Sequence, residues 1–163
     1  MCRSNTTDGT FDPGGILSRA QLAQILYNME GKPGINGGGS FMDVAPDSWY
    51  ADAVMWAAAQ GIAGGYGNGK FGPNDHITRE QLAVMLWRYS REPAAAGKEL
   101  PFSDANRASG WALDALRWAA ENGILNGKGN GMLDPRGLTS RAETAQMLKN
   151  LAENSEENPA ENK

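Results

Sequence analysis

The amino-acid sequence predicts an all-α fold made of helix–loop–helix repeats. Three observations predict it. The chain repeats itself with a shift of about 60 residues, which is longer than the period of most solenoid repeats. Each copy contains stretches whose apolar residues recur at helical spacing. The 21 glycines gather at intervals between these stretches, where turns are expected.

Two full copies of the repeat align. One begins at Phe41 and reads FMDVAPDSWYADAVMWAAAQGIAGGYGNGKFGPNDHITREQLAVMLWRY; the other begins at Phe102 and reads FSDANRASGWALDALRWAAENGILNGKGNGMLDPRGLTSRAETAQMLKNL. The segment from Asp8, DGTFDPGGILSRAQLAQILYNM, matches only the second half of a copy. We therefore predict a partial first module at residues 1–33, full modules at 41–91 and 102–152, and a polar tail or linker at 153–163.

The first helix of each full copy carries two tryptophans seven residues apart, Trp49 with Trp56 and Trp111 with Trp118. This spacing predicts that both indoles of a pair lie on one helix face. We expect Trp56 and Trp118 to be in the core. Trp49 and Trp111 stand at the starts of the predicted first helices. A half-exposed indole there either packs against the core or stacks on a sugar.

The second helix of each copy is predicted from apolar residues at i, i+3, i+4 and i+7. The three stripes are Leu22, Ile25, Leu26 and Met29; Leu82, Met85, Leu86 and Tyr89; and Thr144, Met147, Leu148 and Leu151. Gly61 and Gly123 follow the first helices, where a left-handed cap is expected. Five helices result.

A four-residue motif opens each second helix: Ser18-Arg19-Ala20-Gln21, Thr78-Arg79-Glu80-Gln81 and Ser140-Arg141-Ala142-Glu143. It fits the capping box, in which the hydroxyl of the cap residue accepts from the backbone N–H of the third helical residue, and the Gln or Glu side chain accepts from the backbone N–H of the cap residue. Capping does not explain the arginine, because a cation in the first turn faces the positive end of the helix dipole.

Two interpretations of Arg19, Arg79 and Arg141 are compatible with each other. One is an ion pair with a neighbouring repeat, for example with Asp43, Asp104 or an Asp of a first helix. The other is an anion pocket, because a helix start offers free N–H donors and a guanidinium adds a forked donor suited to a carboxylate. For Asp43 and Asp104 themselves, capping a turn, pairing with Arg and binding sugar hydroxyls stay open.

The glycine loops, GGYGNGKFGP, GKGNGMLDP and TDGTFDP, predict turns at Asn68-Gly69, Asn130-Gly131 and Asp8-Gly9. Gly65 and Gly127 are candidates for presenting a bare backbone N–H to a ligand. A calcium site is disfavoured, because an EF-hand loop needs oxygen ligands at alternating positions and a Glu at the twelfth. His76 stands alone, so we expect neither a metal site nor a cofactor.

Composition narrows the function. The net charge of -4 disfavours nucleic-acid binding, and no apolar run reaches the ~20 residues that cross a bilayer. Cys2 is the only cysteine, so no intrachain disulfide forms. The N-terminus lacks an apolar leader, and we expect any export signal to lie outside this chain. No catalytic set can be assembled, which disfavours an enzyme.

The ordered pattern F-x-D-V…W-Y-A-D-A-V…A-A-x-x-G-I…G-Y-G-N-G-K-F-G-P-N-D-x-I-T-R-E resembles the S-layer homology (SLH) family. The resemblance covers nearly all of residues 41–151, and the last third of a module covers 8–29. It implies helix–loop–helix modules in a pseudo-threefold bundle on the bacterial surface, outside the cell. Such modules anchor surface proteins to secondary cell-wall polysaccharide, commonly pyruvylated, through grooves between adjacent modules.

Carried over, the family's carboxylate-binding arginine falls on Arg79 and Arg141, and on Arg19 if its groove survives. The resemblance also makes Trp49 with Asp43, and Trp111 with Asp104, candidates for groove walls. Tyr66 of the second module is replaced by Lys128 in the third, and Phe71 by Leu133, which predicts a weaker or retuned third site.

The partial first module lacks its tryptophan-bearing helix, so one groove is expected to be incomplete unless a second copy of the chain fills it. This leaves a second hypothesis for the function. The chain would be a protein-interaction or self-assembly module that uses exposed helix faces, without direct glycan binding.

Overall fold

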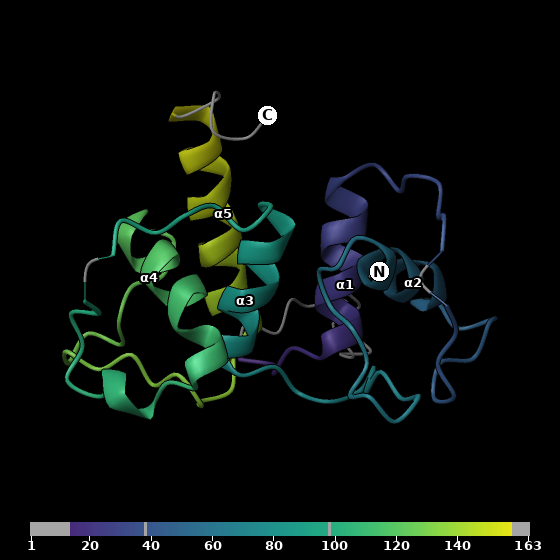
Figure 1. The fold of residues 1–163 in the computed structure, drawn as a ribbon, viewed down its shortest axis with the longest axis horizontal. Coiled ribbons are helices and arrows are strands. Elements are labelled where there is room, and N and C mark those ends of the chain that lie inside the picture. The colour runs from purple at the N-terminus through teal and green to yellow at the C-terminus, as the bar shows by residue number, and fades with distance from the viewer. Residues whose placement is uncertain (1–13, 38, 98, 158–163) are drawn as a thin grey trace. The chain divides into compact units, whose positions relative to one another are not determined.

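The computed structural model describes residues 14–37, 39–97 and 99–157. Cys2, the Asp8-Gly9 turn and the end of the polar tail lie outside them. The α-helices are α1 (Arg19–Met29), α2 (Ala51–Ala59), α3 (Arg79–Tyr89), α4 (Leu113–Glu121) and α5 (Arg141–Glu157), with short 3-10 helices at Ala105–Arg107 and Gly110–Ala112 (Figure 1). Over the described ranges there is no strand, and the predicted all-α class is confirmed.

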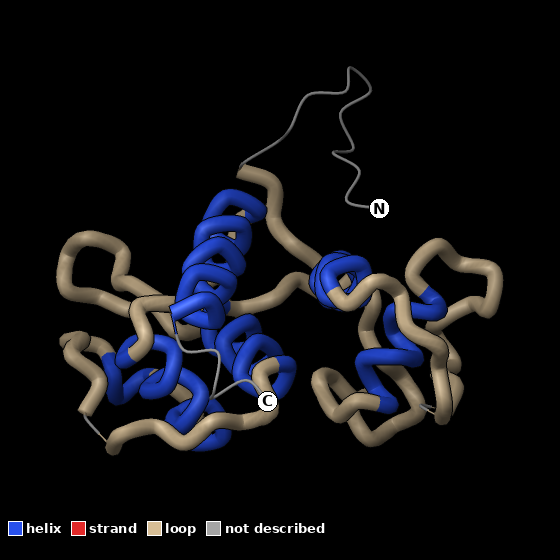
Figure 2. Tube along the Cα trace, turned by 90° about the horizontal axis from the view of Figure 1, so that it is seen from above, coloured by secondary structure: helices blue, strands red, loops and turns tan. Residues whose placement is uncertain are grey.

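The chain divides into two compact units, Met1–Ile77 and Thr78–Lys163. The first unit contains α1 and α2, and the second contains α3, α4 and α5. Each unit thus combines the second helix of one repeat with the first helix of the next. Figure 2 shows how much of the chain between the helices is loop. The module boundaries and the pseudo-threefold arrangement stay predictions.

Apolar faces of the helices form a core in each unit. In the first unit α1 packs against α2, and the rings of Tyr27 and Trp56 lie with their centroids 5.5 Å apart. In the second unit α3 packs against α4, and Leu82, Leu116 and Trp118 are buried there. The predicted core placement of Trp56 and Trp118, each 4% exposed, is confirmed.

The prediction that Trp49 and Trp111 share a helix face with these core tryptophans is wrong. α2 begins at Ala51 and α4 at Leu113, so the helical period does not extend back to either residue. Trp49 is 53% and Trp111 59% exposed. The half-exposed state that the sequence allowed for both indoles is therefore confirmed.

The capping signals in the sequence are confirmed at all three second helices. The side-chain hydroxyls of Ser18 and Thr78 each accept from the backbone N–H of the third helical residue. In turn, Oε1 of Gln21 and of Gln81 accepts from the backbone N–H of the cap residue. Ser140 and Glu143 form the same reciprocal pair at the start of α5, at 3.1 and 3.2 Å. No helix among the described residues is both long and apolar enough to span a bilayer.

Candidate functional site

Arg79 begins α3, and carbonyl oxygens of the loop after α4 hold its guanidinium. Its Nε–H donates to the carbonyl of Leu133 at 2.8 Å, and its Nη2–H donates to that of Asn126 at 3.0 Å. The residue is 4% exposed, and a buried cation needs such partners because removing it from water is costly. The arginine therefore ties the start of one repeat's second helix to the loop of the following repeat.

Arg19 makes the equivalent contacts within the first unit. Its Nε–H donates to the carbonyl of Phe71 at 3.0 Å and its Nη2–H to that of Gly64 at 2.8 Å. The guanidinium carbon also lies 4.7 Å from the ring centroid of Phe71 and 4.9 Å from that of Tyr66. Carbonyls and aromatic faces together compensate this cation.

The N–H groups at the starts of α1 and α3 are already used. In α3, the backbone N–H of Arg79 donates to the carbonyl of Gly137 at 2.9 Å, and the backbone N–H of Glu80 donates to the carbonyl of Pro135 at 2.8 Å. α1 makes two equivalent bonds, of 2.9 and 3.0 Å. The expectation of free N–H donors for an anion is therefore wrong at the starts of these two helices.

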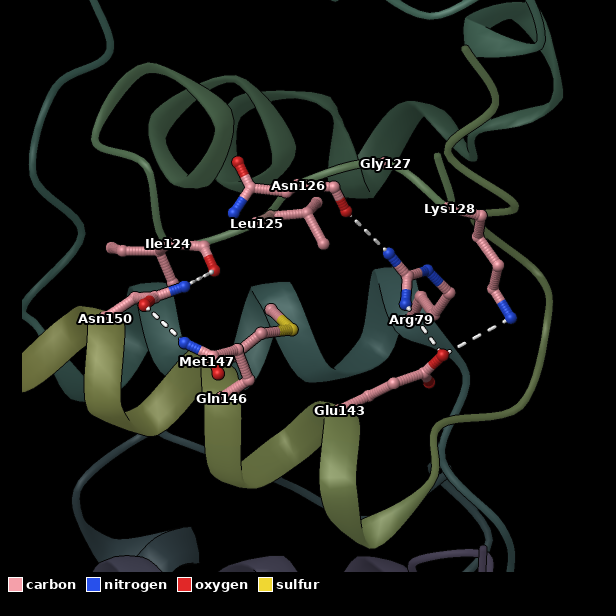
Figure 3. A pocket seen from close by; sticks show the side chains of 10 residues that line it. All are labelled: Arg79, Ile124, Leu125, Asn126, Gly127, Lys128, Glu143, Gln146, Met147 and Asn150. Atoms are coloured by element: carbon pink, nitrogen blue, oxygen red, sulfur yellow. Dashed lines mark hydrogen bonds and ion pairs between the residues drawn. The ribbon is translucent and has the colours of Figure 1, made fainter. Parts of the chain in front are cut away.

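A groove of about 310 Å³ opens beside Arg79 in the second unit (Figure 3), within the usual size of small-ligand sites. The start of α3, the segment after α4 and one face of α5 form its walls. The lining residues are Arg79, Ile124, Leu125, Asn126, Gly127, Lys128, Glu143, Gln146, Met147 and Asn150.

One end of the groove is charged. Oε1 of Glu143 lies 3.5 Å from Nη1 of Arg79 and 3.4 Å from Nζ of Lys128, and that ammonium is also 3.8 Å from Oδ2 of Asp134. Burial opposes ionisation of Glu143, but the N–H of Ser140 and the two cations outweigh it, so the pKa of the carboxyl lies below its usual value. Glu143 is therefore ionised at neutral pH.

The other end of the groove is uncharged. Nε2 of Gln146 donates to Oδ1 of Asn150 at 2.9 Å, and Nδ2 of Asn150 donates to the carbonyl of Ile124 at 3.2 Å. Met147, which is 4% exposed, adds an apolar surface. The groove thus offers ionic groups at one end and amides over an apolar floor at the other, as Figure 3 shows.

Asp43 and Asp104 organise backbone. Asp104 accepts from the N–H groups of Leu133 at 2.7 Å and Asp134 at 2.8 Å, and Asp43 accepts from the matching pair in the first unit at 2.8 Å each. Burial opposes their ionisation, but these bonds outweigh it and hold the pKa of both carboxyls below the usual value. Of the interpretations open for them, the structure supports the turn cap. The carboxylate beside Arg79 is Glu143 and not Asp104.

Gly65 and Gly127 are needed for close packing. A Cβ on Gly127 would lie 2.8 Å from Cε1 of Phe102 and 2.9 Å from the carbonyl oxygen of Met132. A Cβ on Gly65 would lie 2.8 Å from Cε1 of Phe41 and 2.8 Å from the carbonyl oxygen of Lys70. This packing is a structural reason for both glycines; of the two, Gly127 lines the groove.

Of the residues predicted to bind glycan, Arg79 and Gly127 line the groove, and Asp104 holds the N–H of Leu133, whose carbonyl accepts from Arg79. Trp111 is outside the lining, and so is Arg141, a partly buried residue at the start of α5. In the first unit Tyr66 is 52% exposed, and its O–H donates to Oδ2 of Asp75 at 2.7 Å. Glycan contact by these residues stays a prediction.

Sequence reasoning missed several residues that shape the site. The sequence marks Lys128 only as the replacement of Tyr66, and Glu143 only as a capping residue. Together these two side chains form the charged end of the groove with Arg79. Glu80, 4% exposed, accepts from the N–H and the hydroxyl of Ser109 at 2.8 Å each. It thus fixes the segment before α4, and its spacing in the chain carried no signal for this contact. Within the described ranges, no group of three His, Cys, Asp or Glu is placed to hold a metal.

The chain belongs to the S-layer homology domain family, which matches residues 40–83 and 101–145, more than half of its length. It is 33% identical over 156 residues to an amylopullulanase of Thermoanaerobacterium thermosulfurigenes and 32% identical over 156 residues to the exoglucanase XynX of Acetivibrio thermocellus. It is also 31% identical over 158 residues to the surface-layer 125 kDa protein of Lysinibacillus sphaericus. These alignments cover 91%, 91% and 93% of this chain, but only 8%, 14% and 13% of the relatives' own lengths.

Proposed function

We propose that the groove of the second unit binds an anionic cell-wall polysaccharide carrying ketal-linked pyruvate, and that this binding holds the parent protein at the bacterial surface. S-layer homology modules are cell-surface anchoring modules and are not themselves catalytic. The relatives include two glycan-degrading enzymes and a surface-layer protein, which fits a shared module attached to different cargo.

The observation that carries the proposal is the pair of cations at one end of the groove. Lys128 is partly exposed, and Nη1 of Arg79 points to the same carboxylate as the lysine does. A pyruvate ketal carries one carboxylate on an otherwise uncharged sugar. Such a ligand matches the groove, with its acid at the Lys128 end and its hydroxyl groups at the amides of Gln146 and Asn150.

The proposal is tested by a pull-down of the purified chain with cell-wall sacculi, before and after chemical removal of pyruvate. We expect the chain to be retained on intact sacculi and released when the pyruvate has been removed. Equal retention on both preparations would mean that the chain does not recognise the carboxylate. A mock-treated preparation, carried through the same steps without the reagent that removes pyruvate, controls for damage caused by handling.

A protein-interaction or self-assembly function is the second candidate, because Trp49 and Trp111 each expose more than half of a large aromatic surface. Exposed aromatic residues are enriched at protein interfaces. Sedimentation over a range of concentrations tests it. A concentration-dependent dimer together with no affinity for sacculi would favour assembly over glycan binding.

A further inference from the structure

We propose that Glu143 is an internal competitor for the groove: its carboxylate occupies the place of a ligand carboxylate between Arg79 and Lys128, and so sets the affinity of the groove for anions. The inference concerns the same groove as the proposed function and rests on it for the natural ligand. One oxygen, Oε1, faces both cations, at 3.5 and 3.4 Å.

Arg79 leaves one nitrogen for this contact. Its Nε and Nη2 hold the carbonyls of Leu133 and Asn126, and Nη1 is the nitrogen nearest Glu143. An incoming carboxylate that uses both Nη1 of Arg79 and Nζ of Lys128 therefore competes with the Glu143 oxygen for these donors. The side chain of Glu143 is 31% exposed, so a ligand approaching through the groove reaches it.

The contacts of Glu143 are also longer than those of a tight charge-assisted hydrogen bond, which lie near 2.7–2.9 Å. At 3.4 and 3.5 Å, both ion pairs leave room for a better-placed carboxylate. With Asp134 added, the charged end holds two cations and two carboxylates and has no net charge. An acid enters favourably only if it displaces one of these carboxylates or if one is absent.

The charge of Glu143 is not needed for its capping role. At the matching positions of α1 and α3, Gln21 and Gln81 accept from the N–H of their cap residues at 2.8 and 3.0 Å. Glu143 makes the same contact with Ser140 through Oε2 at 3.2 Å and has Oε1 in addition. The negative charge is thus an addition to this repeat, beside Lys128, which replaces the tyrosine of the preceding repeat.

The test is Glu143→Gln, which installs the residue that the other two repeats carry and so keeps the capping box. The probe is sodium pyruvate alone, titrated into the full 15N-labelled chain, with chemical-shift changes at Gly127, Lys128 and the Arg79 side chain as the readout. We expect Glu143→Gln to bind pyruvate roughly fivefold more tightly than the wild type, because the internal carboxylate no longer competes.

Glu153→Gln is the matched control. It removes the same charge from the same helix, at an exposed site paired with Lys149 at 3.9 Å, and should leave pyruvate affinity unchanged. In the double variant Glu143→Gln with Lys128→Gln the gain should disappear. The proposal is overturned if Glu143→Gln binds pyruvate no better than the wild type, including the case in which neither binds, or if Glu153→Gln gains equally.

Failure of the proposed function gives a different result. If the pyruvate titration shows the gain but sacculi retain neither protein, the charged end binds acids as inferred and the wall polymer is not its ligand. If sacculi retain both proteins through pyruvate and the titration shows no gain, the proposed function stands and the role of Glu143 is wrong.

Discussion

The Nε–H of Arg79 donates to the carbonyl oxygen of Leu133 at 2.8 Å, and this bond explains a cation in the first turn of a helix. The guanidinium donates to loop carbonyl oxygens, whose partial negative charge offsets the unfavourable position at the start of α3. Arg19 repeats the arrangement with Phe71 in the first unit, at 3.0 Å. Arg19 and Arg79 are therefore structural residues first, and their contact with a ligand anion stays a prediction.

Arg79→Ala is expected to destabilise the second unit by about 3 kcal/mol, because it leaves two carbonyls without their donors and removes a buried side chain. Chemical denaturation followed by tryptophan fluorescence measures the loss. Arg88→Ala is the control: its side chain is 42% exposed and its ion pair with Glu92 spans 4.0 Å, so its effect should stay within ~0.5 kcal/mol. Equal effects would contradict the structural role of Arg79.

Because Arg79→Ala is expected to destabilise the second unit, the glycan affinity of Arg79 variants has to be interpreted together with their stability. Loss of glycan affinity in Arg79→Ala would follow from a disordered loop as readily as from a lost contact. Lys128 is the better residue for a binding test, because it is partly exposed and its contacts in the groove are ion pairs with Glu143 and Asp134.

Asp104→Asn is expected to weaken the pH dependence of stability in the acid range. The pKa of Asp104 is lower in the folded protein than in the unfolded chain, so its stabilising contribution is complete above about pH 4 and is lost as the pH falls through the folded pKa. Unfolding free energies measured between pH 2 and pH 6, a window set by the ordinary carboxyl pKa, should fall less steeply in the variant.

Asp114→Asn serves as the comparison for this slope. The Asp114 side chain is 73% exposed and lies 3.6 Å from Arg117, so its replacement should leave the acid dependence nearly as in the wild type. An identical slope in Asp104→Asn and the wild type would show that the two backbone bonds of Asp104 do not depress its pKa in solution.

Gly127→Ala is expected to cost about 2 kcal/mol of stability, because its Cβ would overlap Phe102 and the carbonyl of Met132. Gly110→Ala, where a Cβ would meet nothing within 4 Å, should change stability little. Thermal unfolding of both variants decides the point. If Gly127→Ala were as stable as Gly110→Ala, the close approach of the loop to Phe102 would be wrong.

The helices and their caps could be predicted from the sequence because their signals are local. Apolar spacing places α1 and α3, and the Ser/Thr and Gln pairs mark where they begin. The helix starts of α2 and α4 were misjudged, since no hydroxyl or carboxylate side chain caps them and the tryptophan spacing suggested an earlier start. Local signals fail where a helix start depends on tertiary packing.

The site could be predicted only in part, for a physical reason. The arginine motif occurs three times in the sequence. The partners of Arg19 and Arg79, however, are carbonyl oxygens about 50 residues away, and a sequence pattern does not reveal which backbone atoms a side chain will meet. Glu143 also looks like an ordinary capping residue. Its second oxygen gains a role only when the fold brings Lys128 and Arg79 beside it.

The most direct test of glycan recognition by the groove is the dissociation constant for purified, pyruvylated wall polysaccharide, measured by calorimetry for the wild type, Lys128→Gln and Lys149→Gln. Both variants remove one positive charge; Lys149 lies on α5 in an exposed pair with Glu153, outside the groove. We predict that Lys128→Gln weakens binding about fivefold and that Lys149→Gln leaves it unchanged. Equal affinities for all three proteins would contradict recognition of the carboxylate at the Lys128 end.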